Sequence, residues 1–118
     1  MSLSFKVEHR EGYSVVRVDG DPSLGQFLSF LHLIGVETAG WPVKRVLLDL
    51  RDVRTFATFT EHGAVGEEVA RHLQHLHRIA SVVPPDRITR ASEKAAGQSG
   101  VDLTVFTEEG DAIGWLTA

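Results

Sequence analysis

The sequence contains no cysteine. This absence excludes disulfide bonds, thiolate metal sites, iron–sulfur clusters and cysteine nucleophiles. The chain also lacks an excess of positive charge, because 12 lysines and arginines stand against 16 aspartates and glutamates, which gives a net charge of −4. Nucleic-acid-binding domains usually show a basic balance or a basic stripe, so we expect no nucleic acid partner.

Long apolar runs are missing as well. No run approaches the roughly 20 residues that a transmembrane helix needs, so we expect no membrane span. The N-terminal stretch MSLSFKVEHRE is charged and lacks the apolar segment that a signal peptide contains. We therefore expect the protein to be cytoplasmic. Phosphate-binding loops, GxGxxG, nucleophile elbows and a Ser-His-Asp arrangement are absent from the sequence. These absences predict a protein that is not an enzyme and holds no cofactor.

The residues that are present describe one small domain over residues 1–118. An apolar fraction of 42% is enough for a core at this length. Near the N-terminus, apolar and charged residues alternate as in a half-exposed strand, and the turn Glu11-Gly12 joins this strand to a second, valine-rich one. Two strands joined so tightly form an antiparallel hairpin.

After the hairpin, helices and strands are expected to alternate. Asp21 is a candidate helix cap and Pro22 suits a first helical turn. Strands are expected over residues 5–10, 13–19, 43–50, 78–83 and 101–106, with helices over residues 22–38, 60–77, 86–98 and 108–116 and a loop over 51–59. The order β-β-α-β-α-β-α-β-α predicts an α/β fold, in which an antiparallel N-terminal strand joins a mainly parallel sheet packed with four helices.

The helix over residues 22–38 has more apolar surface than one sheet can cover. Projection at about 100° per residue places Phe30 and Leu33 outside its main apolar stripe. In one reading, these two side chains form a binding surface for a second copy, another protein partner or a lipid. In the other reading, they are covered within the chain by the neighbouring helix or by the segment around Trp41. We expect the first reading, in which the domain binds a second copy or another protein.

Two phenylalanines in the loop that follows the third strand suggest an alternative function. Phe56 and Phe59 either fold back against the core near the helix that begins at Thr60, or line an apolar pocket beside the first helix. The second arrangement would make the protein a carrier of a small apolar or lipid ligand.

Carboxylates and histidines are the remaining candidates for chemistry. The expected carboxyl end of the sheet gathers acidic residues that either cap helices or hold a hard cation, namely Asp19, Asp21, Asp49, Asp52, Asp86, Glu108 and Glu109. His72 and His75 are three residues apart, about one helical turn, so both could bind the same metal ion. The sequence places no third ligand near them. We therefore expect capping carboxylates, border histidines and no metal.

The layout resembles that of the SpoIIAA-like bacterial proteins, a branch of the STAS superfamily (sulfate transporter and anti-sigma factor antagonist domains). The resemblance rests on the stretches Arg45-Val46-Leu47-Leu48-Asp49-Leu50, Arg78-Ile79-Ala80-Ser81-Val82-Val83 and Phe106-Thr107-Glu108-Glu109, with Ala112, Trp115 and Leu116. It covers essentially the whole chain and implies a STAS/SEC14-like fold with a regulatory or binding role. The matching motifs are short and mostly structural.

The resemblance also points to one loop. STAS domains that antagonise anti-sigma factors carry a phosphorylatable serine in an Asp-Ser-x-Gly loop after the third strand. The equivalent stretch here begins at Asp52 and contains neither serine nor glycine. The candidate phosphate acceptors in this stretch are the hydroxyl groups of Thr55, Thr58 and Thr60.

Overall fold

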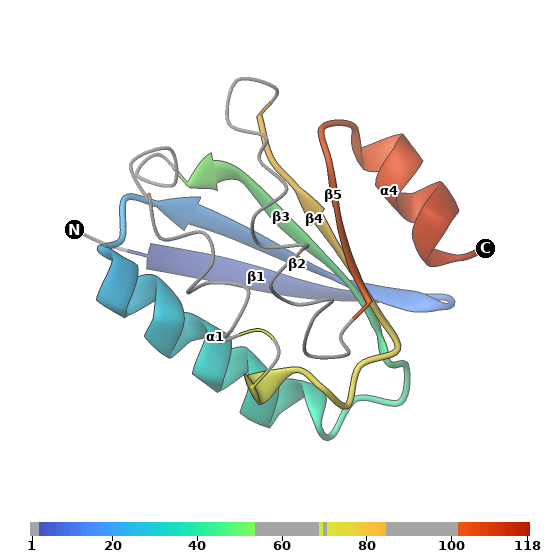
Figure 1. Ribbon diagram of the computed structural model, residues 1–118, viewed down its shortest axis with the longest axis horizontal. Coiled ribbons are helices and arrows are strands. Elements are labelled where there is room, and N and C mark those ends of the chain that lie inside the picture. Colours follow the sequence, from blue (N-terminus) through green and yellow to red (C-terminus); the bar gives the residue numbers. More distant parts are fainter. Residues whose placement is uncertain (1–2, 54–68, 70, 85–101) are drawn as a thin grey trace.

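The computed structural model describes residues 3–53, 69, 71–84 and 102–118, and within these ranges it contains one five-stranded sheet (Figure 1). The elements in chain order are β1 (Leu3–Arg10), β2 (Tyr13–Gly20), α1 (Leu24–Thr38), β3 (Arg45–Val53), β4 (Arg78–Val82), β5 (Leu103–Phe106) and α4 (Glu109–Leu116). The strands lie side by side in sequence order. β1 is antiparallel to β2, and each pair from β2 to β5 is parallel. The predicted mixed α/β sheet is therefore confirmed.

The N-terminal hairpin turns through Glu11 and Gly12. Arg10 and Tyr13 are the last paired residues on either side of the turn. Gly12 has a φ of +88°, a left-handed conformation that glycine adopts without a steric penalty. The hairpin leaves β1 at one edge of the sheet, paired only with β2 among the described strands.

Helix α1 begins at Leu24, two residues later than the predicted start at residue 22. Ser23 is the N-cap, and its side chain accepts a hydrogen bond from the backbone N–H of Gln26, whose own side chain accepts one from the backbone of Ser23. This reciprocal pair satisfies two backbone donors that would otherwise lack partners. The prediction that Asp21 is the cap and that the helix starts at residue 22 is therefore wrong.

Strand β3 continues beyond its predicted end. Residues 51–53 were expected to open a loop, but they belong to the strand, and Asp52 and Val53 are in register with Asp19 and Gly20 of β2. The reason is that Val53 is fully buried in the core, which holds the chain against the sheet after the apolar run has ended.

The sheet is covered on both faces, as the nearly continuous apolar run of β3 predicts. Alternate residues of β3, such as Leu48 and Leu47, enter two separate cores. The larger core packs against α1 and the smaller one against α4, and Figure 1 shows these helices on opposite sides of the sheet. Neither helix is long and apolar enough to cross a membrane.

Two of the four predicted helices are present as described elements, α1 and α4. The helix predicted over residues 86–98 lies outside the described residues. Most of the helix predicted over residues 60–77 also lies outside the described residues. Of its described residues, 69, 71 and 72 are helical. That helix was expected to reach His77, which is wrong, because residues 73–77 are no longer helical.

Gly35 marks the place where α1 meets the segment around His72. A methyl group on Gly35 would lie 2.6 Å from the carbonyl oxygen of His72, a backbone atom that cannot move aside cheaply. We expect Gly35→Ala to lower the free energy of unfolding by about 2 kcal/mol, because the two segments must separate. Urea denaturation measures the change.

Gly25 in the same helix supplies the matched control. A methyl group there meets no heavy atom within 4 Å. Gly25→Ala is therefore expected to leave the stability unchanged or to raise it by up to about 1 kcal/mol, through helix propensity alone. Equal effects of the two substitutions would contradict the close contact at Gly35.

Candidate functional site

Of the residues in the loop equivalent to the phosphorylated STAS loop that were singled out as candidates, the structure describes Asp52 alone. Asp52 is exposed near the end of β3, beside Asp19 of β2. The candidate phosphate acceptors and the candidate pocket residues lie outside the described residues, namely Thr55, Thr58 and Thr60, and Phe56 and Phe59. Their roles therefore stay predictions.

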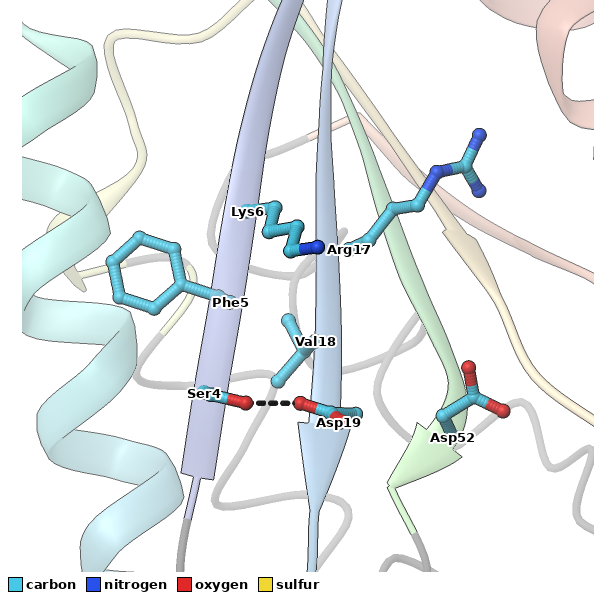
Figure 2. A pocket seen from close by; sticks show the side chains of 7 residues that line it. All are labelled: Ser4, Phe5, Lys6, Arg17, Val18, Asp19 and Asp52. Atoms are coloured by element: carbon cyan, nitrogen blue, oxygen red, sulfur yellow. Dashed lines mark hydrogen bonds between the residues drawn. The ribbon is translucent and has the colours of Figure 1, made fainter.

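A shallow hollow of about 250 Å³ lies over the same end of β1, β2 and β3. Its lining residues are Ser4, Phe5, Lys6, Arg17, Val18, Asp19 and Asp52. Figure 2 shows Ser4 donating a hydrogen bond to Asp19 across the two strands, with Phe5 directed away toward α1. The hollow is small for a ligand pocket and mixes both signs of charge.

Beside this hollow, Asp49 forms the centre of a charged cluster on the α4 side of the sheet. Its side chain is nearly buried, with the whole residue 6% exposed. One carboxylate oxygen accepts hydrogen bonds from the backbone N–H and the Nε of Arg51, at 3.2 and 2.9 Å. The other oxygen accepts from Arg17 at 2.7 Å and from Arg51 at 2.8 Å.

Both arginines also bind Glu109, the first residue of α4. Arg17 donates to the two carboxylate oxygens of Glu109 at 2.8 and 3.3 Å, and Arg51 donates at 2.8 Å. Together, four residues form an arginine–carboxylate cluster: Arg17, Asp49, Arg51 and Glu109. The cluster links β2 and β3 to the N-terminus of α4.

The cluster shifts the pKa values of its acidic members. Burial acts to raise the pKa of Asp49, but the hydrogen bonds and the charge of Arg51, together with Arg17, outweigh burial and hold that pKa below its ordinary value. The hydrogen bond from Arg17 likewise lowers the pKa of Glu109. The charges of Asp49 and Glu109 are thus balanced by Arg17 and Arg51. These contacts do not support the alternative reading in which the two carboxylates help to hold a hard cation.

The C-terminal end of α4 is bound to the sheet by two further arginines. Arg45 donates to the carbonyl oxygen of Leu116 at 3.1 Å, and Arg78 donates to that of Trp115 at 2.6 Å. The guanidinium of Arg78 also lies over the ring of Trp115, 5.2 Å from its centre. These contacts supply partners for carbonyl groups that a helix end leaves unsatisfied. Helix α4 is therefore fixed at both ends.

On the other side of the sheet, the structure separates the two residues predicted to form the partner surface of α1. Phe30 is only 4% exposed, and its ring packs edge-on against Phe5 of β1 with centroids 5.1 Å apart. The expectation that Phe30 lies on an open surface is therefore wrong, because the edge strand covers it. Leu33 remains 43% exposed, and Val36, one turn further, is 63% exposed.

Three histidines, His32, His72 and His75, lie where α1 meets the segment after residue 69. His32 and His72 face each other with their Nδ1 atoms 3.3 Å apart, and His75 Nε2 is hydrogen-bonded to Thr38 Oγ1 at 2.7 Å. Burial and the charge of Lys44 lower the pKa of His75. Within the described ranges, no group of three or more His, Cys, Asp or Glu residues is arranged to hold a metal ion.

Sequence reasoning missed the arginine–carboxylate cluster. A single aspartate inside the apolar run Val46-Leu47-Leu48-Asp49-Leu50 was a usable signal, because a carboxylate on a covered strand needs a cationic partner. Arg17, which lies among valines on the neighbouring strand β2, is that partner. Arg17 and Asp49 are directly opposite each other in the register of the two strands.

Comparison with known proteins gives a family and two similar folds. The profile of the SpoIIAA-like family matches residues 14–117. A crystal structure of an anti-sigma factor antagonist from Mycobacterium paratuberculosis is 17% identical, with a TM-score of 0.65 over 99% of this chain and 96% of that one. An uncharacterized protein with a SpoIIAA-like fold from Shewanella loihica is 15% identical, with a TM-score of 0.56 over 97% and 93% of the two chains. No curated protein matches.

The arginine–carboxylate cluster can be tested by removing its central charge. We expect Asp49→Asn to lower the free energy of unfolding at pH 7 by about 2 kcal/mol, because two arginines lose their most buried partner. Asp111→Asn is the matched control, since Asp111 is exposed in the first turn of α4. Chemical denaturation measures the free energy of unfolding of both variants. The control should differ from the wild type by no more than about 0.5 kcal/mol.

The effect of Asp49→Asn is also expected to depend on pH. The pKa of Asp49 is lower in the folded protein than in the unfolded chain, so its stabilising contribution is present above the unfolded value and is lost as the pH falls through the folded one. Wild type and Asp49→Asn should therefore converge in stability in acid. A difference between them that stays constant from pH 7 to pH 2 would rule out an ionic role for Asp49.

Proposed function

Because the chain belongs to the SpoIIAA-like family, we propose that it is a non-enzymatic, STAS-like regulatory domain that binds a protein partner through the outer face of α1. The fold that it shares with an anti-sigma factor antagonist supports this class of role, since that protein's name describes action on another protein. At 17% identity the likeness itself extends to the fold alone.

The observation that carries the proposal is the exposure of Leu33 and Val36. They are two of the three large apolar side chains that are exposed among the described residues. They are three residues apart, so they lie one turn from each other on the same side of α1. Burying a leucine or valine side chain contributes roughly 1.5–3 kcal/mol, so a partner that covers both gains a useful part of its binding free energy.

The rest of α1 keeps this face rigid. Its opposite side places Phe27, Leu31 and Ile34 in the larger core, and the capping box at Ser23 fixes its start. A helix held in this way loses little conformational entropy on binding, which favours recognition by a complementary apolar groove.

The alternative function, a carrier of a small apolar ligand, receives less support from the described residues. Phe30, which was expected to help form its surface, belongs to the core. The hollow at the end of the sheet is lined by Lys6, Arg17, Asp19 and Asp52, which suit polar groups rather than a lipid chain. The roles expected of Phe56 and Phe59 belong to this alternative.

Site-specific photocrosslinking tests the proposed partner face. A photoreactive amino acid replaces Val36 in the protein expressed in its own host, and Asp111 on α4 is replaced in the same way as the control. We expect a covalent adduct with one other protein from position 36 and none from position 111, with the partner identified by mass spectrometry.

The other outcomes count against the proposal. No adduct from position 36, or the same adducts from both positions, would contradict a partner on α1. An adduct between two copies of the chain would show that the outer face of α1 forms a homodimer contact. That result would contradict the proposal that a different protein binds there.

A further inference from the structure

The edge strand β1 presents an unpaired row of backbone groups. Because Arg10 and Tyr13 close a two-residue turn, they form a hydrogen-bonded pair, and every second residue back along β1 also bonds to β2. The residues between them, Phe5, Val7 and His9, therefore direct their N–H and C=O groups away from β2, toward the open edge. No described strand pairs with that edge.

The side chains of β1 divide between the two faces of the sheet. Phe5 and His9 lie on the α1 side, where Phe5 contacts Phe30 and His9 packs edge-on against Trp41 with centroids 4.8 Å apart. Val7, between them on the same side, is 38% exposed. On the other face the strand carries Lys6, Glu8 and Arg10, where Arg10 binds Glu8 at 2.8 Å.

We propose that β1 pairs antiparallel with β1 of a second copy of this chain, centred on Val7, to give one continuous sheet across a two-fold axis. In this register Val7 faces Val7 of the second copy as a hydrogen-bonded pair. Phe5 faces His9 of the second copy in the same way. A two-fold axis makes the two halves of the contact identical, so the assembly closes at two chains.

The charges of β1 fit this register. It places Lys6 directly opposite Glu8 of the second copy, and Glu8 opposite Lys6, at non-hydrogen-bonded positions where Cβ atoms lie about 5 Å apart. Lys6 has no ion-pair partner within the described part of its own chain, so the second copy supplies one.

The neighbouring registers are opposed by the same charges. A slip of two residues in one direction places Lys6 opposite Lys6, and a slip in the other direction places Glu8 opposite Glu8. Like charges directly opposite each other destabilise strand pairing. Charged residues usually protect an edge strand from association, and here they leave one antiparallel pairing open.

The β1 edge is a different surface from the outer face of α1 that carries Leu33 and Val36. The dimer therefore does not depend on the proposed partner, and a failure of either proposal leaves the other standing.

Charge exchange across the axis tests the proposal. Sedimentation equilibrium of the full chain between about 1 and 500 μM measures the dimer dissociation constant in low salt. We expect the wild type to dimerise and Lys6→Glu and Glu8→Lys each to weaken the dimer by about tenfold or more, because each change creates two like-charge pairs. The double variant Lys6→Glu/Glu8→Lys should regain most of the affinity.

Two further variants separate the edge from general effects. Val7→Pro removes an N–H that points to solvent and keeps the bonds to β2, so it should leave a folded monomer, with circular dichroism and urea midpoint as checks. Asp111→Lys changes the net charge by the same amount as Glu8→Lys but lies on α4, so it should leave the dimer unchanged.

Three results would overturn the proposal. The first is a wild type that stays monomeric up to about 500 μM. The second is a dimer that survives Val7→Pro in a folded protein. The third is a double charge exchange that fails to recover the affinity lost in the single variants, because that outcome excludes Lys6 and Glu8 as direct partners.

Discussion

The carboxylate of Asp49 determines how far apolar packing extends over one face of the sheet. It interrupts a buried strand and is tolerated there because Arg17 and Arg51 surround it with hydrogen bonds. The same arginines bind Glu109 and so position the start of α4. Helix α4 contacts β3, β4 and β5. On the same face of the sheet, β1 has the charged side chains Lys6, Glu8 and Arg10 and no apolar core residues. Both proposed binding surfaces lie outside the region that this cluster organises.

The order of the strands along the chain, and a parallel sheet with one antiparallel strand, could be predicted from local patterns. A two-residue turn with glycine indicated the hairpin, and a continuous apolar run indicated a strand covered on both faces. The end of β3 could not be predicted in this way, because residues 51–53 are polar until Val53, whose burial depends on residues distant in sequence. Tertiary packing there overrides the local sequence.

The candidate site was only partly visible in the sequence for a related reason. Helical projection correctly places Leu33 outside the core stripe, but it cannot show that Phe5 from another strand covers Phe30. The projection treats a helix as if it had one neighbour, whereas α1 lies between the sheet, the edge strand and the segment around His72. Contacts between distant segments decide which apolar side chains of such a helix stay in water.

The short turn at Gly12 has a consequence for how the chain reaches this structure. The hairpin is the most local pairing in the sheet, whereas each parallel pair must wait for a long connection to close. We expect the hairpin to form early, so that β1 presents its outer edge to other molecules while the later strands are still unpaired. Refolding yield should then fall as chain concentration rises, because an edge displayed on an incomplete fold also accepts wrong partners.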